Sequence, residues 1–198
     1  MIVEFFKANF FELWLKAVVM ANVGQKAPNF NLRNANKAHG GETMSLDDAR
    51  GENGTIVVFE CNHCPYVIAS IGRMEDMAVF AKQSNIGFIG INSNDPIVYA
   101  NDDFEHMVKR ADAGMGYPYL HDETQEIATA YGAKRTPEFY LLDSNDVIVY
   151  RGRMDDSPRD PSDVTTTELK DAVDAILAGN TPDVTQTESI GCSVKWKQ

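Results

Sequence analysis

Two spacings of apolar residues alternate along the chain, one typical of buried strands and one typical of helices. The β-branched run at 55–59 predicts a buried strand, and a second apolar run at 86–91 predicts another. Between them, apolar residues recur at helical spacing and predict a helix, at Val67, Ile71, Met74, Ala78 and Ala81. The chain therefore passes from strand to helix to strand within about forty residues.

The second half of the chain continues this alternation. Phe104, Met107, Val108 and Ala111 predict a helix that stops before Gly114. Asp122 and Gln125 resemble a capping box that begins a short helix, which Gly132 closes. Runs at 139–142 and 147–150, joined by a polar turn, predict a hairpin. Thr165 and Glu168 resemble a second capping box, before a helix that ends at Gly179.

The predicted order is strand, helix, strand, helix, helix, strand, strand, helix. This order indicates an α/β fold in which helices flank a mixed central sheet, as an α/β/α sandwich. We expect one domain over residues 20–198, with residues 1–19 as an N-terminal extension that is amphipathic in pattern. The extension lacks a basic leader before an unbroken apolar stretch, so a secretory signal is not expected.

Charge and cysteine content narrow the function classes. The 198 residues include 29 acidic and 18 basic side chains, a net charge of −11, which argues against nucleic acid or an anionic membrane surface as partner. The sequence has no apolar run long enough to cross a bilayer. Three cysteines are too few for a disulfide-stapled secreted scaffold of this size, so we expect a cytoplasmic, reducing compartment.

The most informative motif is Cys61-Asn62-His63-Cys64, followed by Pro65, at the junction of the first strand and helix. A Cys-x-x-Cys at such a junction is the thioredoxin-type redox arrangement. Because Pro65 suits the first helical turn, free amide groups and the helix dipole should stabilise a thiolate. We expect Cys61 to be the attacking thiol and Cys64, shielded inside the first turn, to be the resolving one.

The alternatives for this motif are a haem site, a zinc site and a pair of merely buried cysteines. A c-type haem site needs histidine directly after the second cysteine, where this chain has Pro65. Structural zinc needs four ligands, and neither Cys192 nor the histidines provide a second paired spacing, so no metal and no bound cofactor are expected. Two merely buried cysteines remain an alternative.

A second motif, Tyr131–Asp143, resembles the thioredoxin-fold signature in which a cis proline packs opposite the redox pair. The resemblance implies that Pro137 is that cis proline and that Thr136 offers its backbone to an extended substrate. A trans proline beginning a strand is the alternative. Further stretches resemble the peroxiredoxin-like, redoxin-domain branch of the thioredoxin superfamily, at 61–67, 93–95, 150–153 and 189–197.

The chain departs from true peroxiredoxins, which carry Pro-x-x-x-Thr-x-x-Cys. When that cysteine is aligned on Cys64, Cys61 replaces the threonine and Val57 replaces the proline, so the peroxide-binding set is absent. Where many members of the branch have a cysteine, this chain has Arg135, which we expect near the redox pair, favouring the thiolate.

His63 is expected to tune the pair, with a solvated role as the alternative. The resemblance makes Cys192 a candidate additional thiol on a tail folded over the domain, although a buried, inert thiol is favoured.

These observations predict a thiol–disulfide oxidoreductase that acts on protein or small-molecule disulfides and takes electrons from a thioredoxin or glutathione system. One alternative is an antioxidant thiol peroxidase. Another is a redox-regulated or metal-binding interaction module without turnover.

Overall fold

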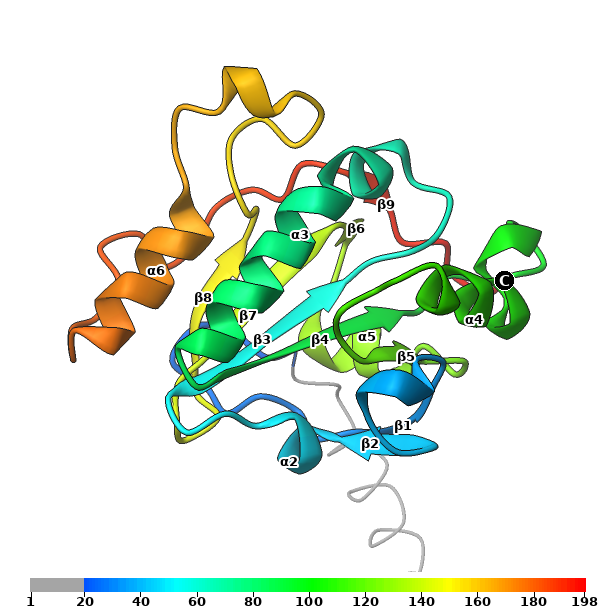
Figure 1. Cartoon of the computed structure of the whole chain (residues 1–198), viewed down its shortest axis with the longest axis horizontal. Coiled ribbons are helices and arrows are strands. Elements are labelled where there is room, and N and C mark those ends of the chain that lie inside the picture. The colour runs from blue at the N-terminus through cyan, green and yellow to red at the C-terminus, as the bar shows by residue number, and fades with distance from the viewer. Residues whose placement is uncertain (1–19) are drawn as a thin grey trace, which may run out of the picture.

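The computed structural model describes residues 20–198, so the predicted extension at 1–19 lies outside the described residues. Seven strands form a mixed sheet in the order β2-β1-β5-β4-β3-β7-β8, and β6 and β9 form a separate pair (Figure 1). The strands are β1 (Asn31–Asn34), β2 (Thr43–Ser45), β3 (Gly54–Phe59), β4 (Ile86–Asn92), β5 (Tyr119–His121), β6 (Arg135–Thr136), β7 (Glu138–Leu142), β8 (Ile148–Gly152) and β9 (Cys192–Ser193). The central strands β3, β4 and β5 run parallel, whereas β7 pairs antiparallel with β3.

Helices cover both faces of the sheet, as the predicted sandwich requires. In Figure 1, α3 crosses in front of the central strands, with α6 beside it, and α5 lies behind them. The helices are α2 (Leu46–Ala49), α3 (Pro65–Gln83), α4 (Phe104–Asp112), α5 (Glu126–Tyr131) and α6 (Glu168–Leu177), with short 3₁₀ turns at Lys37–His39, Ala100–Asp102 and Pro161–Asp163. Within residues 20–198, no helix has the length and apolar character needed to cross a membrane.

Strand β3 is buried on both faces and joins the two halves of the core. Ile56 and Val58 pack in a cluster with α3, α4 and α6, whereas Val57 and Phe59 pack in a second cluster with α5. This division follows from the alternation of side chains along a strand. Because β3 and β4 are parallel, the residues after both strands meet at one edge of the sheet, where Cys61 lies.

The predicted strands and helices are confirmed, but the two predicted capping boxes are wrong. Gln125, the N-cap of α5, has left-handed backbone geometry and no side-chain cap, although Asp122 accepts hydrogen bonds from Ile127 and Ala128. Helix α6 begins after Thr167, and the carboxylate of Glu168 pairs with Arg153 instead. The short strands β1, β2, β5, β6 and β9 were not predicted.

Candidate active site

Cys61 and Cys64 lie between the end of β3 and the start of α3. Cys64 is the N-cap of α3, and Pro65 occupies its first turn, as the sequence predicted. Neither cysteine forms a disulfide, and both are fully buried, at 0% exposure. The predicted difference in shielding between them is therefore wrong, because Cys61 is as enclosed as Cys64.

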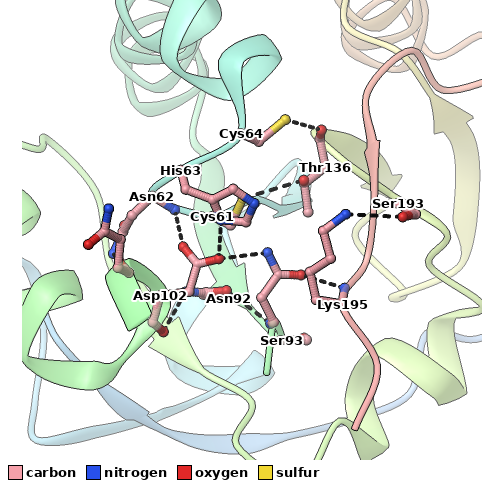
Figure 2. A network of polar contacts seen from close by, with 12 residues as sticks. Cys61, Asn62, His63, Cys64, Asn92, Ser93, Asp102, Thr136, Ser193 and Lys195 are labelled. Atoms are coloured by element: carbon pink, nitrogen blue, oxygen red, sulfur yellow. Dashed lines mark hydrogen bonds and ion pairs between the residues drawn. The ribbon is translucent and has the colours of Figure 1, made fainter. Parts of the chain in front are cut away.

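Both sulfur atoms lie within hydrogen-bonding distance of Thr136. The peptide bond between Thr136 and Pro137 is cis, which confirms the expectation for Pro137. The Sγ atom of Cys61 lies 3.5 Å from the hydroxyl of Thr136, and the Sγ atom of Cys64 lies 3.1 Å from its carbonyl oxygen (Figure 2). Residues more than seventy positions apart in the sequence thus meet around one side chain and one carbonyl group.

The two thiols have opposite pKa shifts. The hydrogen bond with Cys64, burial and the nearby carboxylate of Asp102 all raise the pKa of Cys61 well above its usual range. The hydrogen bond with Cys61, followed by contacts with Cys192 and the backbone N–H of Val67, lowers the pKa of Cys64 to about 4, against the opposing effect of burial. The directions of these shifts favour the thiolate on Cys64, whereas the sequence prediction placed it on Cys61.

His63, between the two cysteines, is held from two sides. Its Nδ1 atom lies 2.5 Å from Oδ2 of Asp102, and its ring stacks on Tyr99 with a centroid distance of 3.9 Å and an interplanar angle of 4°. Such contacts fix both the position and the plane of the imidazole. His63 is therefore an oriented group and not the freely solvated residue of the alternative interpretation.

Asp102 was missed by the sequence analysis. Besides His63, its buried carboxylate accepts hydrogen bonds from the backbone N–H of Asn62 at 2.7 Å and from Nδ2 of Asn94 at 2.8 Å (Figure 2). Three donors compensate for the burial of this charge. Asp102 comes from the 3₁₀ turn before α4, which carries no local signal of a role at a cysteine pair.

A second buried carboxylate, that of Glu60, has a charge partner separate from those of Asp102. It pairs with Arg110 of α4 and accepts a hydrogen bond from Tyr117 at 2.9 Å. Arg110 also donates to the carbonyl oxygen of Cys61 at 3.0 Å. The guanidinium thereby links α4 to the backbone of the redox motif, a contact that the sequence did not predict.

Arg135 does not take its predicted place. Its guanidinium is exposed and donates to the carbonyl oxygen of Gly191 at 3.0 Å, and its charge acts on Cys192 instead of on the pair. Arg135 and Thr136 are successive residues of β6, so their side chains point in opposite directions. Because Thr136 faces the cysteines, Arg135 faces away from them.

Cys192 lies on β9, which pairs antiparallel with β6. Its side chain is only partly buried and packs against the core cluster that contains Cys61 and Cys64. The favoured sequence interpretation, an inert buried thiol, does not describe this position.

One group in the described part of the chain could offer metal ligands, formed by Cys61, His63 and Asp102, whose ligand atoms lie within 4.8 Å of one another. Tetrahedral zinc would still need a fourth donor. The carboxylate of Asp102 already accepts three hydrogen bonds, so the arrangement is complete without an ion.

A protein family and several solved structures are similar to this chain. The AhpC/TSA family matches residues 23–151. A crystal structure of a conserved protein from Geobacillus kaustophilus is 40% identical, with a TM-score of 0.82, and the match covers 90% of this chain and 94% of that one. A hypothetical protein from Sinorhizobium meliloti 1021 is 35% identical, with a TM-score of 0.80 and coverage of 89% and 95%.

Peroxidoxin BcpB from Mycobacterium tuberculosis shares the fold at 18% identity, with a TM-score of 0.54 and coverage of 80% of this chain and 95% of its own. No curated protein sequence matches the chain.

Proposed function

The chain belongs to the AhpC/TSA family, and from this premise we propose that it is a thiol–disulfide oxidoreductase whose reactive groups are Cys61 and Cys64. The observation that carries the proposal is the convergence of both sulfur atoms on Thr136, beside cis Pro137. Two thiols that are three positions apart in the sequence and share one partner are suited to closing a disulfide.

In the proposed reaction, Cys64 attacks first, because its pKa is the lower of the two. Its thiolate attacks one sulfur of a substrate disulfide, and the other sulfur leaves as a thiolate. Cys61 then loses its proton and attacks the Sγ atom of Cys64, which releases the second substrate thiolate. The dithiol is oxidised to the Cys61–Cys64 disulfide, and its two electrons reduce the substrate.

The second step needs an acceptor for the proton of Cys61. His63 and Asp102 are the titratable pair within 4.8 Å of its sulfur, and stacking on Tyr99 keeps the imidazole in place. We assign His63 the role of proton acceptor and Asp102 the role of orienting it. Arg135 is left out of this step, since its guanidinium lies on the tail.

A thioredoxin or glutathione system in a reducing compartment is the proposed source of electrons. Substrates are protein or small-molecule disulfides, because a Cys-x-x-Cys pair exchanges with either. The reaction requires no bound cofactor.

A second candidate, a thiol peroxidase, is favoured by one specific observation. Cys64 has the lowered pKa, and it is the residue that aligns with the reactive cysteine of peroxiredoxins. Against this candidate, Cys61 and Val57 occupy the positions of the peroxide-binding threonine and proline. The two candidates differ in which oxidant reacts fast.

A competition between oxidants tests the proposal. Wild-type protein, Cys61→Ser and Cys64→Ser would be supplied with dithiothreitol and either insulin or hydrogen peroxide. We expect wild-type protein to reduce insulin disulfides and both variants to lose that activity, while peroxide consumption stays near that of an unassisted thiol. Fast peroxide consumption that needs only Cys64 would replace the proposal with the peroxidase.

A further inference from the structure

The C-terminal segment pairs as a short strand with β6, next to the redox pair. In β9, Cys192 pairs with Thr136 and Ser193 pairs with Arg135, and the N–H of Val194 donates to the carbonyl oxygen of Lys134 at 3.0 Å. Figure 2 shows this segment running past Thr136, which lies between the segment and the two cysteines in this view. The tail therefore occupies the backbone edge that an extended substrate was predicted to use.

The approach of the tail is closest at Gly191. A β-carbon at this position would lie 2.2 Å from the carbonyl oxygen of Thr136 and 2.7 Å from its carbonyl carbon. Both are backbone atoms next to the cis proline, so a larger residue would force the tail or β6 to move. Only glycine fits immediately before the cysteine of the tail.

Three thiols meet at this edge. Cys192 pairs with Thr136, whose carbonyl oxygen lies 3.1 Å from the Sγ atom of Cys64, and its side chain packs against the cluster that contains Cys61 and Cys64. The first two cysteines of the chain are fully buried, whereas Cys192 is partly exposed. Among the described residues, the thiol that reaches both solvent and the redox pair is thus Cys192.

We propose that Cys192 is a third redox thiol, which forms a disulfide with Cys64 during turnover and passes it to the Cys61–Cys64 pair. The proposal rests on the proposed function and adds to it an internal, tail-borne partner that is bound as an extended cysteine-containing strand.

The chemistry balances as three exchanges. The thiolate of Cys64 attacks an external disulfide and releases one thiolate. Cys192, after losing its proton, attacks the Sγ atom of Cys64 and releases the second thiolate, leaving a Cys64–Cys192 disulfide. Cys61 then attacks Cys64, so that the Cys61–Cys64 disulfide forms and Cys192 is again a thiol. Overall, one external disulfide gains two electrons and one protein dithiol loses them.

The local charges favour the second exchange, in which Cys192 attacks Cys64, only after Cys64 has formed the mixed disulfide. Burial, the hydrogen bond with Cys64 and the charge of Cys64 raise the pKa of Cys192 to about 11 in the reduced protein, against Lys195 and Arg135. Once Cys64 is held in a mixed disulfide, its negative charge is gone, while the two cations remain. Cys192 therefore becomes easier to ionise only after Cys64 has reacted.

A trapping experiment tests the proposal in the full chain. Reduced Cys61→Ser protein would be treated with one equivalent of dipyridyl disulfide, and the product would be mapped by mass spectrometry without reduction. We expect a peptide in which Cys64 is linked to Cys192 and no retained pyridyl group. The same treatment of the Cys61→Ser, Cys192→Ser double variant should leave the pyridyl adduct on Cys64.

Two matched variants separate tail docking from the mere presence of a thiol. Moving the thiol by one residue, with Cys192→Ser and Ser193→Cys together, turns it to the other face of β9 and should abolish the link. Gly191→Ala keeps every thiol but should slow the link at least about tenfold, the equivalent of about 1.4 kcal/mol of docking. Gly72→Ala is its control, because a β-carbon there would meet nothing within 4 Å.

The result that overturns the proposal is a Cys61→Ser protein that keeps the pyridyl adduct or does not react at Cys64. If that variant fails to fold, acid-quenched samples of oxidising wild-type protein give the same decision. A Cys64–Cys192 peptide should rise and fall before the Cys61–Cys64 peptide, and its absence at every time point would reject the proposal. If wild-type protein reduces insulin without forming this peptide, only the inference is rejected. If wild-type protein does not reduce insulin, the proposed function is rejected.

Discussion

Replacing Asp102 with asparagine should make Cys61 a markedly stronger acid. The carboxylate is fully buried, lies within 4.8 Å of the sulfur of Cys61 and raises the pKa of that thiol. At that separation and an effective dielectric constant of about 20, the interaction between the two charges is worth about 3 kcal/mol. Its removal should lower the pKa of Cys61 by about two units.

The assay needs Cys61 to be the sole thiol, because Cys64 also shifts the pKa of Cys61. In a Cys64→Ser, Cys192→Ser background, the chemical shift of the ¹³C-labelled β-carbon of Cys61 can be followed against pH, with and without Asp102→Asn. Asparagine has the same shape and can still accept the hydrogen bond from the N–H of Asn62. The titration thus reports mainly the loss of charge.

The matched control is Asp103→Asn, which removes an equal charge from the adjacent residue. Asp103 caps α4 through the N–H of His106 and is far more exposed than Asp102. Because solvent screens it and asparagine is also a good N-cap, the pKa of Cys61 should shift by well under about one unit. An unchanged or raised pKa of Cys61 in Asp102→Asn would refute the electrostatic reasoning and leave burial as the cause.

Three further outcomes are expected. Tyr131→Phe should leave the unfolding free energy in urea unchanged or slightly higher, because within residues 20–198 its buried hydroxyl has no partner. Tyr140→Phe should cost about 1–3 kcal/mol, because it removes the hydroxyl whose proton is shared between the carbonyl oxygen of Tyr131 and the carboxylate of Glu138; equal losses in the two variants would contradict this. Glu60→Gln should destabilise the protein by about 3–5 kcal/mol, since Arg110 would stay buried without its anion, and a wild-type urea midpoint would disprove that. In wild-type protein, iodoacetamide labelling of Cys64 should be constant near neutral pH and fall only as the pH drops through about 4; a rate still rising above pH 7 would contradict the lowered pKa.

Local patterns were sufficient for the centre of the fold but not for its edges. Strand β3 and helix α3 were predictable because burial on both faces and helical spacing are written in consecutive residues. Strand β1, with the sequence Asn-Leu-Arg-Asn, is short and polar and forms only because β2 and β5 flank it. The capping box at Thr165 and Glu168 failed for a similar reason, since a distant arginine pairs with the carboxylate.

The site divides in the same way. Cys61, Cys64 and Pro65 are neighbours in sequence and were predicted together, whereas Asp102 and Arg110 reach them from a turn and a helix about forty or more residues away. The spacing of apolar residues within one helix or strand carries no information about such a long-range contact. The misplacement of Arg135 is different, because strand alternation would have corrected it once Thr136 was assigned to face the cysteines.

Thr136 explains why burial of the pair and docking of the tail occur together. Its hydroxyl lies against Cys61, its carbonyl oxygen lies against Cys64, and its backbone pairs with Cys192. Because its backbone is already paired with β9, Thr136 cannot receive an external strand while β9 is in place. Any substrate that pairs with this backbone must therefore displace the tail, together with the thiol of Cys192, which packs against the cluster that contains Cys64. Access to the redox pair and the position of the third thiol are thus set by the same two-residue strand.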